Sequence, residues 1–329
     1  MVVLTCRGSQ KSDLHRTELH SRHNICFWIL VVAFSTALFG CSRAHSQAAV
    51  AVKPAPIEFI QQWGVRGNEP GQLENPVGLA ADPIGRIYFA DRATGFVQKF
   101  EASGIPLLCF ETPAARSAGA VAVDSGGAIY VANLHAGLIQ IFFPQGDPLR
   151  GLRIAPERGY EGPFTFSIDG EGRIYVPDPL GGRVQVFNSH GALLKHWRIA
   201  PNSTETLAHP FAVVAANDAV YVGEAGTNRI LKFSADGIQK AEFKASDGDA
   251  GRLLALAAGN KHVFALTGFP VRLHVWSEDG HLGLTDSMGD RLSGVESAVY
   301  LAADAAGDLI VLDSEARRVL RFRAHLDLP

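Results

Sequence analysis

Cysteine is scarce in this sequence and almost confined to its beginning. Only four cysteines occur in 329 residues, and three of them lie within the first 41 positions. If that leader is removed, Cys109 alone remains in the globular part, which excludes an intramolecular disulfide framework and predicts an inert core thiol. The paired Cys-x-x-Cys spacing of structural zinc sites is absent as well.

The sequence also lacks a basic stripe and the common catalytic motifs. The formal net charge is −3, and after the leader lysine and arginine do not cluster. Because phosphate binding needs clustered positive charge, nucleic acid is excluded as a partner. Neither a Gly-x-Ser-x-Gly elbow nor a glycine-rich phosphate loop occurs, so no catalytic residue is predicted from a motif.

The apolar run in the leader is too short to span a bilayer. Ile25 to Gly40 holds sixteen residues without a charge, after a segment with basic side chains, whereas a spanning helix needs about 20. This is the pattern of a signal peptide. The run ends Leu38-Phe39-Gly40-Cys41, which resembles the bacterial lipobox, although Phe39 stands where a small residue is usual. The resemblance implies cleavage after Gly40 and lipidation of Cys41; a plain secretory signal or an uncleaved anchor is the alternative.

The chain is therefore expected to have three parts. Residues 1–40 are a lipoprotein signal peptide, residues 41–58 a flexible tether of small and polar residues, and residues 59–329 the globular part. Acyl chains on Cys41 would anchor the protein to a membrane of the bacterial cell envelope. Ser42 stands where some lipoproteins carry an inner-membrane retention Asp, so we expect a periplasm-facing protein of the outer membrane.

A tandem repeat dominates the globular part. Six short apolar runs each end in a polar residue, and an aromatic residue lies nine positions after each of these polar residues. The polar series is Asp91, Asn133, Asp178, Glu224, Thr267 and Asp313. The aromatic series is Phe100, Phe142, Phe187, Phe233, Trp276 and Phe322. Repeats of this length indicate a propeller or a solenoid.

Each copy predicts four short strands. Runs of four to six residues rich in Val, Ile, Phe and Tyr alternate with turns. The first turn is Asp-x-x-Gly in four copies, beginning at Asp82, Asp124, Asp169 and Asp304, which fits a type I turn with glycine at its last position. Such sheets bury both faces only when packed radially, so the fold class is all-β, a six-bladed β-propeller of four-stranded antiparallel blades. The last copy lacks a fourth strand, and we predict that the strand-like run at residues 58–63 supplies it and closes the ring.

The repeat resembles the NHL repeat. The clearest copy runs from Asn75-Pro76-Val77-Gly78 to Asp91, and the likeness covers about residues 59–325. Copies five and six match the NHL pattern less well. In the fifth, Thr267 replaces the acidic residue and Gly259-Asn260 replaces the Asp-x-x-Gly turn. The resemblance implies a six-bladed NHL-type propeller. Some members of the group hold zinc with three histidines at equivalent blade positions, and that triad is absent here.

The candidate site follows from the topology. The loops that lead into the innermost strands share a face with the turns between second and third strands, and loops on a rigid scaffold commonly carry function. The predicted ligand-binding residues are Asn75, Arg116, Glu161, His209, Arg252 and Glu296. The Asp91 series is instead interpreted as structural, with its carboxylates accepting turn N–H groups or pairing with an arginine five residues later. A lone His209 fits a surface or capping role better than a metal ligand.

The innermost strands carry no acidic, basic or amide side chain. Metal ligands would therefore have to come from loops. The leading functional hypothesis is a non-enzymatic binding scaffold that recognises an envelope protein, peptide or glycan. A propeller-type lyase or hydrolase with loop-borne metal ligands is the alternative, and a structural spacer is a third. No cofactor or metal ligand is predicted, and a structural or loop-bound Ca²⁺ is left open.

Overall fold

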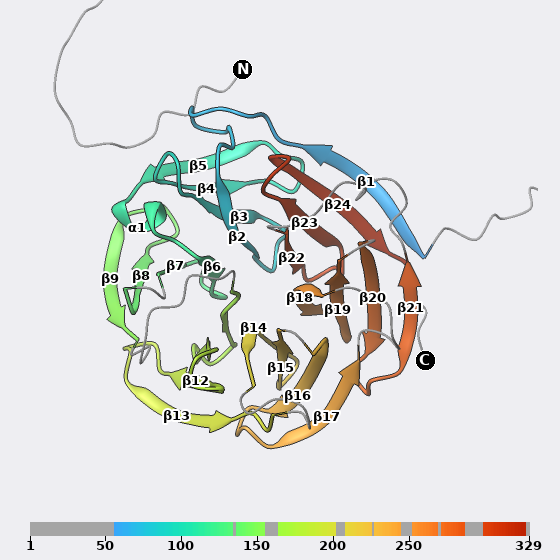
Figure 1. The fold of residues 1–329 in the computed structure, drawn as a ribbon. Coiled ribbons are helices and arrows are strands. Elements are labelled where there is room, and N and C mark those ends of the chain that lie inside the picture. The colour runs from blue at the N-terminus through green and yellow to red at the C-terminus, as the bar shows by residue number, and fades with distance from the viewer. Residues whose placement is uncertain are drawn as a thin grey trace, which may run out of the picture. The chain divides into compact units, whose positions relative to one another are not determined.

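Six four-stranded antiparallel sheets make up the part of the chain that the computed structural model describes, and they are arranged around a common axis as a β-propeller (Figure 1). The described residues are 56–133, 136–154, 164–201, 208–225, 227–244, 252–268, 271–286 and 299–326. The predicted fold class is confirmed. Within each blade we name the strands A to D from the axis outward.

The blades follow one another along the chain. Blade 1 contains β2 (Pro76–Ala81), β3 (Ile87–Asp91), β4 (Phe96–Phe100) and β5 (Pro106–Glu111). Blade 2 contains β6 (Ala120–Val123), β7 (Ile129–Asn133), β8 (Leu138–Phe142) and β9 (Pro148–Arg153). Blade 3 contains β10 (Ser167–Ile168), β11 (Ile174–Asp178), β12 (Arg183–Phe187) and β13 (Leu193–Arg198). Blade 4 contains β14 (Pro210–Ala216), β15 (Ala219–Glu224), β16 (Arg229–Ser234) and β17 (Gln239–Lys244). Blade 5 contains β18 (Leu253–Gly259), β19 (His262–Thr267), β20 (Arg272–Ser277) and β21 (Leu282–Asp286). Blade 6 contains β22 (Val299–Ala303), β23 (Leu309–Asp313), β24 (Arg318–Ala324) and β1 (Ile57–Trp63).

The first strand of the chain closes the ring, as predicted. Strand β1 pairs with β24 in antiparallel register, with Phe59 opposite Phe322 and Trp63 opposite Val319. The rings of Phe59 and Phe322 lie 5.7 Å apart, edge to face. β1 begins at Ile57, two residues before the expected start of the propeller at residue 59. Because β1 pairs with the outer edge of β24, the third strand of the last blade has no unpaired edge.

Burial follows the position of a strand in its blade. Strand β3 is buried along its whole length, whereas exposed and partly buried residues dominate in β13. Second strands are sandwiched between two neighbouring blades, which explains their uninterrupted apolar runs. The six aromatic residues predicted at the third strands are all core residues, each at most 3% exposed.

A contact between consecutive blades repeats around the ring. An aromatic residue of one fourth strand packs on the third-strand aromatic of the next blade, as Trp197 does on Phe233, with ring centroids 5.6 Å apart. The same ring covers Gly237, where a Cβ atom would lie 2.6 Å from a ring carbon. Trp63, Phe110 and Phe243 make equivalent contacts with Phe100, Phe142 and Trp276. Sequence reasoning missed this contact, although the aromatic residues recur in the fourth strands.

In the Asp-x-x-Gly turns the aspartate side chain stabilises the turn, in addition to the glycine in the left-handed region. Asp82 is buried and accepts hydrogen bonds from the backbone N–H groups of Ile84 and Arg86 and from the hydroxyl of Tyr88 at 2.8 Å. Burial opposes ionisation of Asp82, but the hydrogen bonds outweigh it and lower its pKa. Asp124 binds the hydroxyl of Tyr130 in the same way, and there burial raises the pKa of the phenol to about 12. The signal in the sequence is a tyrosine six residues after the aspartate.

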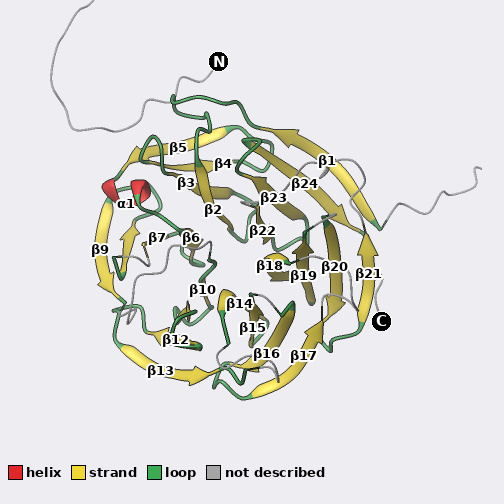
Figure 2. Ribbon diagram, in the orientation of Figure 1, coloured by secondary structure: helices red, strands yellow, loops and turns green. Residues whose placement is uncertain are grey.

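Helix is nearly absent from the described residues (Figure 2). The short α1 (Pro113–Arg116) begins after Thr112, whose hydroxyl caps it by accepting the N–H of Ala114. In the described part of the chain, no helix has the length and apolar character to cross a membrane. Cys109 is buried in β5 as expected, but its sulfur is in a disulfide. The expectation of a free, inert thiol at Cys109 is therefore not met.

Candidate functional site

The two faces of the propeller differ in the length of their connections. Inter-blade loops and the turns between B and C strands form one face, which we call the inter-blade face; the A–B and C–D turns form the opposite turn face. The inter-blade loops comprise eight to thirteen residues, at 64–75, 112–119, 154–166, 199–209, 245–252 and 287–298. The A–B connections comprise two to five, at 82–86, 124–128, 169–173, 217–218, 260–261 and 304–308.

Four of the six predicted ligand-binding residues are described, and all four lie on the inter-blade face, before the start of an innermost strand. They are Asn75 before β2, Arg116 before β6, His209 before β14 and Arg252 before β18. Their side chains are exposed. The other two, Glu161 and Glu296, lie outside the described residues.

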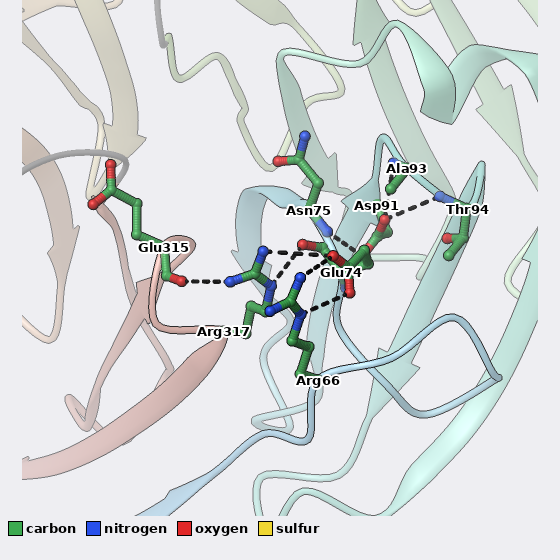
Figure 3. Close-up of polar contacts among 8 residues, drawn as sticks. All are labelled: Arg66, Glu74, Asn75, Asp91, Ala93, Thr94, Glu315 and Arg317. Carbon is green, nitrogen blue, oxygen red and sulfur yellow. Dashed lines mark hydrogen bonds and ion pairs between the residues drawn. The ribbon is translucent and has the colours of Figure 1, made fainter.

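A buried carboxylate fixes the loop that carries Asn75 (Figure 3). One oxygen of Asp91 accepts the backbone N–H groups of Glu74 and Asn75, at 2.7 and 3.0 Å. The other accepts those of Ala93 and Thr94, at 3.0 and 3.2 Å. The carboxylate therefore ties the inter-blade loop to the B–C turn of blade 1, and the Asn75 side chain points away from it.

Two arginines add a junction between the last blade and the first (Figure 3). The carboxylate of Glu74 pairs with Arg66 at 3.1 Å, and its backbone carbonyl accepts a hydrogen bond from Nε of Arg317 at 2.9 Å. The hydrogen bond from Arg66 lowers the pKa of Glu74. Arg317 lies in the B–C turn of blade 6, so this contact joins the chain on both sides of the ring closure.

The structural interpretation of the Asp91 series is confirmed in the other acidic copies. Each acidic residue pairs with the arginine five positions later, at 2.7 to 2.9 Å. The pairs are Asp178 with Arg183, Glu224 with Arg229 and Asp313 with Arg318. Asp178 and Asp313 also accept turn N–H groups. These side chains are used in holding turns, which leaves the inter-blade loops as the candidate contact surface.

Arg116 and His209 each bridge two blades. Arg116 donates to the carbonyl of Ala93 at 3.0 Å and pairs with Glu111 at 3.0 Å. Nδ1 of His209 lies 3.2 Å from the carbonyl oxygen of Pro179 in the B–C turn of blade 3. Asn75 and Arg116 thus flank one turn, whereas His209 lies at the seam of blades 3 and 4 and Arg252 begins blade 5. The structure groups the first two and separates the others around the ring.

The innermost strands enclose a channel of about 190 Å³. Its wall is made of side chains from all six blades, Leu79, Val121, Phe166, Val213, Leu256 and Leu301 among them, with Thr165 and Ser167 as polar members. In the described residues, no group of three or more His, Cys, Asp or Glu side chains could hold a metal ion. The channel wall, as far as it is described, therefore contains no ionisable side chain.

Blade 5 carries a buried histidine in place of the acidic pairing. Nε2 of His274 lies 3.0 Å from the hydroxyl of Thr267, and Nδ1 lies 3.1 Å from that of Thr285. The ring is 2% exposed and stacks on Trp276. Burial, and secondarily the charge of Arg272, lowers the pKa of His274 below its usual value of 6.5.

We expect this histidine to make stability depend on pH. Its folded-state pKa is depressed, so the unfolded chain takes up the proton first, and the free energy of unfolding falls as pH decreases below about 6.5. Urea unfolding of the wild type and of His274→Gln between pH 7.5 and 5 measures this. The variant should lose part of the acid sensitivity. Identical pH profiles for the two proteins would contradict the assignment.

Comparisons with known proteins show the fold of this chain but no function. No protein-family model matches the chain, and no curated protein matches its sequence. A catalytically inactive His-to-Ala variant of virginiamycin B lyase from Staphylococcus aureus, solved with quinupristin, is similar in structure: the TM-score is 0.57 at 14% identity, over 80% of this chain and 85% of that one. A streptogramin B lyase gives 0.54 at 13% identity, over 81% and 98%. The β-propeller domain of Cps50 (Swd1) from Myceliophteria thermophila gives 0.54 at 12% identity, over 78% and 85%. At these identities the likeness shows the β-propeller fold.

Proposed function

We propose that this chain is a non-enzymatic binding scaffold with an NHL-type propeller, anchored in the bacterial cell envelope through a lipid on Cys41. Its inter-blade face recognises an envelope protein, a peptide or a glycan. The lipobox-like end of the leader supports the anchor, and the absence of a retention Asp after Cys41 supports the outer membrane.

The observation that carries the proposal is the asymmetry between the two faces. All the long connections start and end at strand termini of one face, and exposed polar side chains such as Asn75 and Arg252 lie at the described ends. Beneath them, Asp91 and the carboxylate–arginine pairs hold the turns in fixed positions. A rigid frame with polar loops of different lengths favours recognition, because little entropy is lost when the partner binds.

Crosslinking in the native envelope, followed by identification of the captured molecules, tests this proposal. The double charge reversal Arg116→Glu with Arg252→Glu should reduce capture of the partner at least tenfold. Lys261→Glu is the matched control, since Lys261 is an exposed basic residue on the turn face. If the control loses the partner as strongly, recognition does not use the inter-blade face. If deletion of the protein disturbs a complex that no variant affects, a structural spacer explains the data better.

A lyase or hydrolase is the second candidate, because two of the similar structures are lyases. Loop residues would then have to supply metal ligands, with Ca²⁺ or Zn²⁺ as the ions to test and His209 as the described histidine on the inter-blade face. Incubation with quinupristin should yield no product if the chain is a scaffold. Turnover that needs a stoichiometric metal and is lost in His209→Ala would replace the scaffold proposal.

A further inference from the structure

The exposed apolar side chains of the propeller gather on the turn face. Nine of them, between 38% and 74% exposed, lie in A–B or C–D turns or at the start of fourth strands in blades 1 to 5. We give the name apolar rim to six of these nine: Ile84, Leu107, Leu149, Leu194, Ile238 and Leu282. Among the described residues, the inter-blade face exposes only Val65 and Leu180 of comparable size. Single exposed apolar residues are common, but a concentration of nine of them at one face is not explained that way.

Both ends of the propeller also leave from the turn face. The first residue of β1, Ile57, pairs with Ala324 at the end of β24, and the N–H of His325 donates to the carbonyl of Pro56 at 2.8 Å. β24 is a third strand, so its end lies where the other blades form their C–D turns. The tether and Cys41 are therefore joined to the propeller at this face, in the blade that carries no rim residue.

We infer that the apolar rim contacts the lipid surface to which Cys41 is anchored, so that the turn face lies on the membrane and the inter-blade face points away from it. This inference rests on the lipid anchor of the proposed function. Residues 41–56 reach about 50 Å when extended and about 20 Å on average as a flexible coil. An anchored propeller thus stays close to the bilayer, and a weak apolar contact suffices at that effective concentration.

Charge on the turn face does not favour a different kind of contact. Exposed side chains of both signs occur there, such as Glu171, Lys240 and Lys261. An electrostatic attraction to anionic headgroups would need a predominance of basic residues. We therefore expect the rim to act by burying apolar surface at the interface, with little dependence on salt.

Lipid quenching of a site-specific fluorophore tests this orientation. The full chain is purified from envelopes with Leu194→Cys or Leu180→Cys, labelled, and reconstituted in vesicles of phosphatidylethanolamine and phosphatidylglycerol containing brominated lipid. Leu194 and Leu180 are both exposed and lie on opposite faces, whereas Cys109 is buried. The label at position 194 should be quenched at least threefold more than that at 180, in low and in high salt. Equal quenching on vesicle-bound protein would overturn the inference.

A variant series separates the rim from the anchor. The triple change Leu107→Ser, Leu149→Ser, Leu282→Ser should bring quenching at position 194 down to the level at position 180. Val65→Ser, on the inter-blade face, should leave it unchanged. The mass of the amino-terminal peptide reports lipidation by itself: an unmodified Cys41 contradicts the proposed anchor, while a lipidated chain without preferential quenching contradicts only the rim contact.

Discussion

Replacing Asp91 with alanine is expected to lower the free energy of unfolding by about 3–5 kcal/mol, because a buried charged acceptor shared by four backbone N–H groups is lost. The side chain is fully buried, and its oxygens bind the N–H groups of Glu74, Asn75, Ala93 and Thr94. Without the carboxylate, the first inter-blade loop and the first B–C turn lose their common attachment. Urea denaturation followed by circular dichroism measures the change.

Two control variants accompany this prediction. Asn75→Ala removes an exposed side chain from the same loop and should change stability by no more than about 0.5 kcal/mol. Asp91→Asn keeps one acceptor oxygen and should have an intermediate effect. A stability loss in Asn75→Ala as large as that in Asp91→Ala would show that the loop, and not its carboxylate attachment, holds blade 1.

Gly78→Ala is expected to destabilise the protein by about 2–5 kcal/mol through backbone strain and overpacking. Gly78 lies in the innermost strand β2 with a φ of +66°. A Cβ atom there would stand 2.6 Å from the backbone nitrogen of Val121 and 2.9 Å from Cα of Ala120. These atoms belong to the innermost strand of blade 2, so the clash can be relieved only by moving two blades apart.

Gly170→Ala is the matched control for this change. Gly170 lies in the A–B turn of blade 3, and a Cβ atom there would meet nothing within 4 Å. We expect its thermal midpoint to stay within 2 °C of the wild type, since a change below about 0.5 kcal/mol moves the midpoint little in a domain of this size. A Gly78→Ala protein as stable as Gly170→Ala would contradict the close approach of β2 and β6.

The candidate site could be located from the sequence but not evaluated there. Spacing places Asn75, Arg116, His209 and Arg252 before innermost strands, and the structure puts them on one face. That Arg116 binds the carbonyl of Ala93 and that His209 approaches the carbonyl of Pro179 depends on the neighbouring blade. Such contacts join residues of different repeats, and the spacing within one repeat contains no information about them.

The sequence by itself determined the number of blades, the four-strand unit, the buried aromatic series and the closing role of residues 58–63. These follow from local patterns that recur with each copy, because period-two strands and Asp-x-x-Gly turns are encoded within a few residues. Only the tertiary structure decided which fourth-strand aromatic covers which glycine, how Glu74 joins blade 6 to blade 1, and which face bears the exposed apolar side chains. The physical reason is that these features arise where separate blades meet, and the angle and distance between blades are set by packing around the whole ring.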